Sequence, residues 1–240
     1  MANSHIISII VPTYNEKETI INFLEKTTGQ IIRNNLNAEV IVVDDGSPDG
    51  TADLINDFSK MHANITLLNR REKKGLASAC IYGFNHSNSQ ILGVMDADLS
   101  HAPDALPYLL NPLLYNMCDI AVGSRYIPGG RVLNWPMRRY MVSRTACFLG
   151  SLLTTVKDVT SGFFFFKREV ISNVHLDPVG FKICLEILVR GNYQTIMEVP
   201  FTFCDRISGK SKMGTKETLF YLKHLYKLYK YKRKTKKQIL

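Results

Sequence analysis

The chain has 240 residues, 45% of them hydrophobic, which is enough to bury the core of one large domain. Its five cysteines form no Cys-x-x-Cys pair, so a disulfide framework and a zinc site are disfavoured and a reducing, cytosolic setting is favoured. No apolar run approaches the roughly 20 residues of a membrane-spanning helix, and the N-terminus lacks signal-peptide features. The net charge of +9 comes mostly from residues 218–240, which hold eight basic and no acidic residues. We therefore expect a nearly neutral domain over residues 1–217 and a basic tail over 218–240.

Strand-like and helix-like segments alternate along the domain. The predicted strands cover residues 6–11, 40–43, 65–68, 91–95, 120–123, 163–166 and 196–200. The predicted helices between the first four strands cover about 18–34, 51–61 and 76–88. Such alternation indicates an α/β fold with a mostly parallel central sheet flanked by helices on both faces. Ligands of such sheets bind at the carboxyl ends of the strands.

Polar residues follow four of these strands. They are Pro12 to Glu16, Asp44 to Ser47, Asp96-Ala97-Asp98, and Ser124-Arg125. If the extended geometry of the fourth strand continued, Asp96 and Asp98 would project to the same side. Carboxylate oxygens suit Mg2+ or Mn2+, so the motif predicts a metal and its anionic ligand. The alternative is a strand end followed by a helix that Ser100 caps.

The glycine loops that commonly hold nucleotides are missing. No Gly-x-Gly-x-x-Gly follows the first strand, and Gly209-Lys210-Ser211 lacks the earlier glycine of a P-loop, because position 204 is Cys. Basic residues instead gather in the second half of the chain: Arg125, Arg131, Arg138, Arg139, Arg144, Lys182, Arg206 and Lys212. A helix beginning near Pro136 would carry Arg139 and Ser143, which could grip a phosphate; an ordinary solvated basic face is the alternative. The aromatic run over residues 163–166 indicates a core strand.

Eight motifs occur in an order that resembles the inverting family 2 glycosyltransferases with a GT-A fold. They are Ile10-Val11-Pro12-Thr13-Tyr14-Asn15-Glu16, Val42-Val43-Asp44-Asp45-Gly46-Ser47-Pro48-Asp49, Asp96-Ala97-Asp98, Gly123-Ser124-Arg125-Tyr126, Asn134-Trp135-Pro136, Ser161-Gly162-Phe163, Gly180-Phe181-Lys182, and Arg206-x-x-Gly209-x-Ser211-Lys212. The resemblance covers roughly residues 5–215. It is closest to members that move mannose from GDP-mannose to dolichyl or another polyprenyl phosphate, and it implies that reaction.

The resemblance also implies a role for individual residues. The nucleoside would be held by Pro12, Tyr14, Glu16, Val43 and Asp45. The donor and its Mg2+ or Mn2+ would be bound by Asp96, Ala97 and Asp98, with Ser100 at a third metal position where family members often have Gln. The donor sugar or phosphates would contact Arg125, Lys182, Arg206 and Lys212, and the catalytic set would be Asp98, Arg125, Arg206 and Lys212. The acceptor phosphate would be gripped by Arg139 and Ser143.

The basic tail shows helical periodicity. Leu222, Leu225, Tyr226 and Tyr229 would form an apolar stripe, with Lys223, His224, Lys227 and Lys230 on the other face. Charge pattern alone leaves open a helix packed on the domain, a membrane-surface helix and a nucleic-acid contact. The resemblance favours the membrane over nucleic acid. It implies a peripheral enzyme on the cytoplasmic face of the endoplasmic reticulum or of a prokaryotic plasma membrane, with small membrane-protein subunits as partners.

Two other functions fit the same motifs. One is transfer of glucose or another sugar from a UDP-sugar, because a metal site does not select the base. The other is a catalytically silent GT-A module that acts as a binding subunit.

Overall fold

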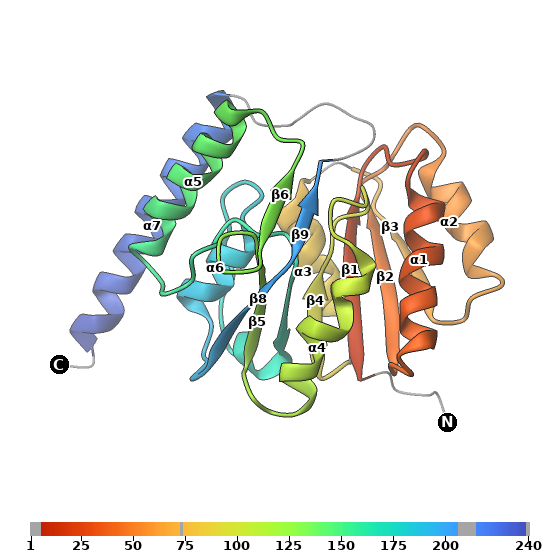
Figure 1. Ribbon diagram of the computed structural model, residues 1–240, viewed down its shortest axis with the longest axis horizontal. Helices are drawn as coiled ribbons and strands as arrows, with labels where there is room; N and C mark the ends of the chain where they lie inside the picture. The colour runs from red at the N-terminus through yellow and green to blue at the C-terminus, as the bar shows by residue number, and fades with distance from the viewer. Residues whose placement is uncertain (1–5, 73, 206–214, 239–240) are drawn as a thin grey trace.

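The computed structural model describes residues 6–72, 74–205 and 215–238. Seven strands form one sheet in the order β3-β2-β1-β4-β7-β5-β8 (Figure 1). Their bounds are β1 (Ile7–Thr13), β2 (Ala38–Asp44), β3 (Ile65–Asn69), β4 (Ile91–Val94), β5 (Ile120–Ser124), β7 (Phe164–Lys167) and β8 (Ile196–Pro200). Every predicted strand is present, with ends that lie within two residues of those expected.

The sheet is mostly parallel, as predicted. The exception is β7, which runs antiparallel to both β4 and β5 and so joins the two parallel parts. A second, two-stranded parallel sheet pairs β6 (Arg131–Leu133) with β9 (Thr202–Cys204). These two short strands were not predicted, because three residues are too few to show an alternating pattern.

Helices cover both faces of the sheet (Figure 1). Their bounds are α1 (Ile20–Arg33), α2 (Thr51–Ser59), α3 (Leu76–His86), α4 (Leu106–Leu114), α5 (Met137–Ser151), α6 (Ile183–Arg190) and α7 (Thr215–Gln238), with 3-10 turns at Pro103–Ala105 and Arg168–Ile171. One core cluster takes side chains from α1, α2 and α4, and the other takes them from α3, α5, α6 and α7. The α/β layering predicted from the alternation is therefore confirmed.

The phenylalanine run belongs to both core clusters. Phe163 and Phe165 pack into the first cluster, while Phe164 and Phe166 pack into the second, as the period of two in a strand requires. The neighbouring strand is shaped to this run, because a Cβ added at Gly93 would lie 2.0 Å from the Phe165 ring. The prediction that these aromatic residues are core residues is confirmed.

Helix α7 packs against the domain through a face that lies beside the predicted apolar stripe. Tyr221, His224 and Leu228 are buried, whereas Leu222, Tyr226 and Tyr229 are 47%, 59% and 49% exposed. The predicted boundary at residue 217 falls inside this helix. In the predicted stripe only Leu225 reaches the core, as a partly buried residue.

Contacts to two other helices hold α7 in place. The Tyr221 hydroxyl donates to the carbonyl of Ala146 in α5 at 2.6 Å. His224, predicted on the polar face, is fully buried with its Nε2 2.6 Å from Oε2 of the buried Glu186 in α6. Among the helices of the described residues, none is long and apolar enough to cross a membrane.

Candidate active site

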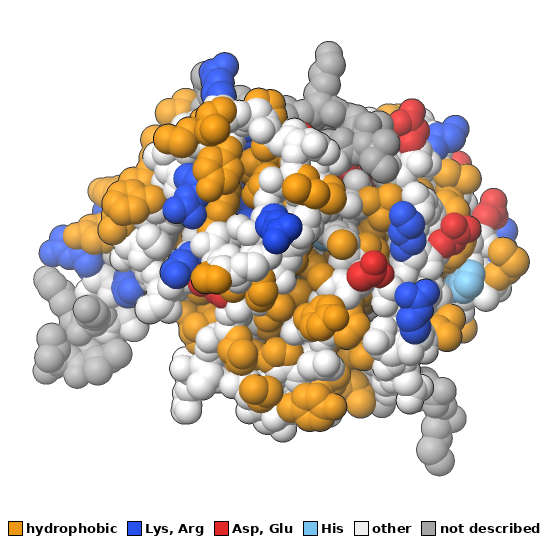
Figure 2. Space-filling model, in the orientation of Figure 1, with side chains coloured by type: hydrophobic (Ala, Val, Ile, Leu, Met, Phe, Trp, Pro, Cys, Tyr) orange, Lys and Arg blue, Asp and Glu red, His pale blue; other side chains and the backbone are white. Residues whose placement is uncertain are grey.

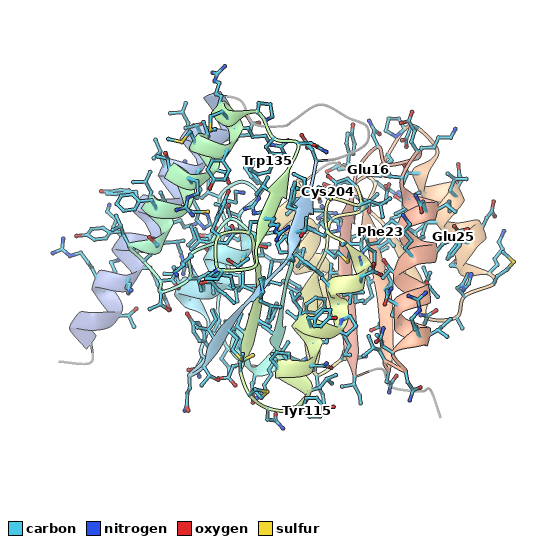
Figure 3. All side chains as sticks on the ribbon, in the orientation of Figure 1. Glu16, Phe23, Glu25, Tyr115, Trp135 and Cys204 are labelled. Atoms are coloured by element: carbon cyan, nitrogen blue, oxygen red, sulfur yellow. The ribbon has the colours of Figure 1, made fainter. Side chains whose placement is uncertain are left out.

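The carboxyl ends of β1, β2, β4 and β5 lie at one edge of the sheet, and Figure 3 shows Glu16, Trp135 and Cys204 at that end of the molecule. The ends of β1 and β2 are in register, with Thr13 paired to Asp44. Asp44 is buried and accepts hydrogen bonds from the Ser47 backbone N–H at 2.8 Å and from its hydroxyl at 2.5 Å. This carboxylate therefore shapes the loop after β2.

Asp45 is occupied by protein partners. One carboxylate oxygen pairs with the buried Arg70, and the other accepts from the backbone N–H groups of Lys74 and Gly75, at 3.2 and 2.8 Å. It thus ties the end of β2 to the loop before α3. The Val43 side chain is fully buried in the core, and the role of this residue toward a nucleoside stays a prediction. Its place there follows from strand alternation, which turns its side chain away from that of Asp44.

Pro12 lies near the end of β1, Tyr14 and Glu16 occupy the loop that follows it, and all three are partly exposed. The Glu16 carboxylate accepts from the Thr19 hydroxyl at 2.9 Å, and its backbone N–H donates to the Thr51 hydroxyl at 3.1 Å. These contacts fix the loop against the start of α2. Pro12 and the two predicted nucleoside residues of this loop are therefore accessible from the sheet edge.

The acidic motif lies in a turn and not on an extended strand. Strand β4 ends at Val94, and Leu99 adopts a left-handed φ of 59°. Asp98 is buried and its Oδ1 accepts from the Ser100 backbone N–H at 3.0 Å. Asp96 is more open, with a side chain that is 32% exposed. The expectation that extended geometry aligns the two carboxylates is therefore wrong, because the turn places them.

The buried His101 side chain holds this turn through a hydrogen bond. Its Nδ1 accepts from the Asp96 backbone N–H at 3.2 Å, and its ring stacks on Phe163 with centroids 5.2 Å apart. Burial lowers the pKa of His101 to about 4, in spite of the nearby Asp98 carboxylate. The neutral imidazole can therefore accept this hydrogen bond. Sequence patterns gave His101 no role.

The turn offers oxygen ligands suited to a divalent cation. The Ser100 hydroxyl is buried and has no hydrogen-bond partner among the described residues. No cluster of three His, Cys, Asp or Glu side chains that could hold a metal occurs in residues 6–72, 74–205 and 215–238. A cation here would thus take Asp96, Asp98 and the Ser100 hydroxyl as its protein ligands and complete its shell from a bound donor. The donor set fits a hard ion such as Mg2+ or Mn2+.

Arg125 sits beneath the site in an ion pair with Asp158. Its Nε and Nη2 each lie 2.7 Å from a different Asp158 oxygen, and Nη2 also donates to the Thr160 hydroxyl at 3.0 Å. Burial would raise the pKa of Asp158, but the charge and hydrogen bonds of Arg125 outweigh burial and hold that pKa below its usual value. Arg125 was expected to contact the donor, but most of its guanidinium N–H groups donate to Asp158 and Thr160.

Lys182 immediately precedes α6 and lies close to this pair. Its Nζ lies 3.3 Å from the Thr160 carbonyl oxygen and 4.5 Å from the centre of the Phe181 ring. Burial, with the positive charge of Arg125, lowers the pKa of Lys182 to about 8. This lysine is mostly protonated at neutral pH and loses its charge in a range that experiments can reach.

The two predicted acceptor residues lie one turn apart on α5. The Arg139 guanidinium donates to Asp205 at 2.6 Å, with its carbon 4.1 Å from the centre of the Trp135 ring. The buried Ser143 hydroxyl accepts from the Tyr126 hydroxyl at 2.7 Å. Ser143 and Lys182 both line a mainly apolar cavity of about 290 Å³ between α5 and α7.

Sequence reasoning gave no role to several residues of this site, although two of them, Tyr126 and Trp135, stand in its motifs. Asp158, Tyr126, Trp135 and Asp205 all contact a predicted site residue. A carboxylate at position 158, three residues before the Ser161-Gly162 motif, was the available signal for Asp158. Arg206 and Lys212, with the motif glycine and serine between them, lie outside the described residues.

Solved structures share this fold. The mannosyltransferase PcManGT from Pyrobaculum calidifontis, in complex with GDP-Man and Mn2+, aligns with a TM-score of 0.64 at 22% identity, covering 95% of this chain and 64% of that one. Glucosyl-3-phosphoglycerate synthase from Mycobacterium tuberculosis, with Mn2+, UDP-glucose and phosphoglyceric acid, aligns with a TM-score of 0.67 at 18% identity, covering 94% and 78%. The chain therefore has the GT-A fold of glycosyltransferases.

Sequence comparison narrows this class. Residues 8–174 match the family described as glycosyl transferase family 2, and the chain belongs to that family. It is 41% identical to a dolichol-phosphate mannosyltransferase of Pyrococcus furiosus over 94% of this chain, but it spans only 64% of that relative's length. It is 38% identical to a polyprenol monophosphomannose synthase of Mycolicibacterium smegmatis, covering 86% of this chain and 80% of the relative. A dolichol-phosphate mannosyltransferase of Saccharomyces cerevisiae is 36% identical, covering 94% and 87%.

Proposed function

We propose that this chain transfers mannose from GDP-mannose to dolichyl or another polyprenyl phosphate, with inversion at the sugar carbon, for use in glycan assembly. The observation that carries the proposal is the identity of 36–41% to relatives named for this activity, over at least 86% of the chain. The acidic turn supports it, because it holds Asp96 and Asp98 together with a buried Ser100 hydroxyl that has no hydrogen-bond partner among the described residues.

The donor would lie across the ends of β1, β2 and β4. Pro12, Tyr14 and Glu16 would contact the nucleoside, while Asp45 would act through the loop that it holds. Asp96, Asp98 and Ser100 would hold Mg2+ or Mn2+, which when bound would offset the charge that develops on the leaving diphosphate. Lys182 would bring a positive charge to the donor phosphates. Arg206 and Lys212 complete the proposed set from the motif alone.

The acceptor needs no separate general base. A phosphate monoester carries a charge of about −1.5 to −2 near neutral pH, so one of its oxygens can attack the anomeric carbon directly. The bond from that carbon to the diphosphate breaks as the new carbon–oxygen bond forms, which gives GDP and a mannosyl phosphodiester. Arg139 and the Ser143 hydroxyl would hold the acceptor phosphate, and the cavity beside Ser143 offers apolar walls.

One experiment tests both the activity and the donor. Purified protein with Mn2+ and a short polyprenyl phosphate is incubated separately with GDP-mannose, UDP-glucose and UDP-N-acetylglucosamine. The lipid product is identified by its mass in mass spectrometry. We expect product from GDP-mannose only. The Asp98→Asn variant, which keeps an oxygen to accept from the Ser100 N–H, should fold normally and make no product. Product from a UDP-sugar instead would favour the other transferase function, and no product from any donor would favour a silent binding subunit.

A membrane-facing surface fits a polyprenyl acceptor. Apolar side chains on α7 (Leu222, Tyr226, Tyr229) and on or just after α5 (Met141, Phe148, Leu152) are at least 47% exposed. Figure 2 shows hydrophobic side chains beside Lys and Arg over these two helices. Basic residues near an anionic membrane contribute about 1 kcal/mol each, and apolar side chains can insert.

We further propose that this surface places the protein as a peripheral enzyme on the cytoplasmic face of the endoplasmic reticulum or plasma membrane. Residues 1–217 would carry the catalytic machinery and 218–240 would contribute to the membrane surface. Small membrane-protein subunits would dock there, and nucleic acid is not an expected partner. The support is the charge of residues 218–240, with eight basic residues and no acidic ones.

A further inference from the structure

The ion pair between Arg139 and Asp205 differs from the deeper pair of the site. The side chains of Arg139 and Asp205 are 20% and 26% exposed, whereas those of Arg125 and Asp158 are 7% and 0% exposed. A partly solvated pair is weakly held and can exchange partners, while a buried bidentate pair cannot separate without a large cost. Of these two arginines, Arg139 is therefore the one that can change its counter-ion.

A second contact keeps Arg139 oriented without competing for its charge. The guanidinium carbon lies 4.1 Å from the centre of the Trp135 ring, within the range of a cation–π contact. Trp135 itself is held in place, since it packs edge-on against Phe203 at 5.1 Å and lies 5.3 Å from the guanidinium carbon of Arg125. If Asp205 released Arg139, the guanidinium would stay on this aromatic platform with its donors available.

We propose that Asp205 is a positioning residue that competes with the acceptor phosphate for Arg139, and that it takes Arg139 back when the product leaves. This inference rests on the proposed function, in which Arg139 binds the acceptor phosphate. The acceptor monoester carries a charge of about −1.5 to −2, so it displaces a carboxylate that carries a single negative charge. The product phosphodiester carries one negative charge, so Asp205 competes with it on equal terms. Competition weakens the binding of acceptor and product, and it speeds product release.

The test uses the Asp205→Asn variant of the full chain, with binding measured by calorimetry in the presence of GDP and Mg2+. The probes are farnesyl phosphate, a monoester, and methyl farnesyl phosphate, a diester that mimics the product. Loss of the competing carboxylate should tighten the binding of both probes by about fivefold, as expected for a partly exposed ion pair. GDP binding should not change. A purely structural role of Asp205 predicts the opposite sign, because Arg139 would lose its support.

Two further variants make the result specific. In an Arg139→Ala background, which should itself weaken farnesyl phosphate binding more than GDP binding, Asp205→Asn should have no further effect. Asp177→Asn breaks a pair with Lys227, also between partly exposed side chains, and should leave binding of both probes unchanged. Weaker or unchanged binding in Asp205→Asn, with normal mannose transfer by the unaltered protein, would overturn this inference alone. No binding of farnesyl phosphate and no transfer by the unaltered protein would overturn the proposed function as well.

Discussion

Arg125 and Asp158 are joined by two parallel hydrogen bonds inside the protein, each 2.7 Å long, and the Arg125 backbone N–H adds a third at 3.0 Å. The pair fastens the end of β5 to the segment that leads into β7. It therefore links the end of β5 to the loop that carries Thr160, and the carbonyl oxygen of Thr160 in turn accepts from Lys182.

Replacing Asp158 with Asn should lower the free energy of unfolding by about 3–5 kcal/mol, because Arg125 would remain buried without a counter-charge. Urea unfolding measures the change. Asp57→Asn is the matched control, since its pair with Lys60 has side chains 70% and 67% exposed and should matter by less than about 0.5 kcal/mol.

The contribution of Asp158 is also pH-dependent. Its pKa is lowered in the folded protein, so its contribution is present above the carboxyl pKa of the unfolded chain and is lost as pH falls through the folded value.

Replacing Ser100 with Ala should have opposite effects on stability and on metal use. The buried hydroxyl has no partner in the described part of the chain, so removing it should maintain or raise the melting temperature of the metal-free protein. If the hydroxyl is a ligand, the concentration of Mn2+ needed for half-maximal activity should rise by about tenfold. Thr27→Val removes another buried hydroxyl of this kind, from α1, and should leave the Mn2+ requirement unchanged. An unaltered Mn2+ requirement in Ser100→Ala would exclude the ligand role.

Binding of GDP with Mg2+ should weaken as pH rises through the Lys182 pKa of about 8. Below this value the ammonium attracts the phosphates, and above it the neutral amine does not, so affinity should fall by about tenfold near pH 9. Calorimetry between pH 7 and 9.5 measures the profile. Lys182→Arg keeps a charge over this range and should flatten the profile. Lys182→Gln should bind weakly at every pH, and a profile with the same inflection in that variant would assign it to another group.

Deleting residues 218–240 should destabilise the protein, because α7 contributes the buried Tyr221, His224 and Leu228. Each large buried side chain is worth about 2–5 kcal/mol, and a chain of this size loses about 2–4 °C in melting temperature per kcal/mol, so we expect a fall of more than about 10 °C. Calorimetric melting of the truncated protein measures it. A truncated chain that melts like the full chain would contradict the packing of α7.

The membrane surface is better tested by point variants than by deletion. Replacing Leu222, Tyr226 and Tyr229 together with Gln changes only side chains that are about half exposed, so the melting temperature should hold. Sedimentation with anionic vesicles should be lost, along with activity on a long-chain acceptor in a bilayer, while activity on a short acceptor in water survives. The control replaces Tyr108, Tyr115 and Met117, which are 60–74% exposed in and after α4. Equal loss of vesicle binding in both variants would argue against a specific surface.

The fold was largely predictable because each strand of the main sheet carries an apolar run and each junction carries polar residues. The direction of β7 was not, since its run of phenylalanines carries no directional signal and its antiparallel pairing is decided by partners far along the chain. The packed face of α7 was also not predicted, and the buried His224 was placed on the polar face. Apolar residues at 221, 225 and 228 and at 222, 226 and 229 have the same helical spacing, and the two sets differ by one residue, or about 100° around the helix.

The acidic turn and the basic residues Arg125 and Arg139 were found from sequence, because their residue types limit their chemistry. The partners of these basic residues were not found. Asp158 binds Arg125 across 33 positions, and Asp205 binds Arg139 across 66. Only the folded chain shows that Arg125 and Asp45 are bound to protein groups on most of their polar atoms, while the Ser100 hydroxyl has no partner within residues 6–72, 74–205 and 215–238.

The reversed strand β7 also sets an order of assembly during synthesis. The strands β3, β2, β1 and β4 pair with one another, so this part of the sheet is complete once the ribosome has passed Val94. Strand β5 pairs only with β7 and β8 within the described sheet, both of which are made later. The nascent chain must therefore carry β5 with two open edges until Phe164–Lys167 emerges, and such edges invite pairing with other chains. We expect the sheet of β1 to β4 to be folded before the later strands exist, and chaperones to be needed most while residues 120–163 are exposed.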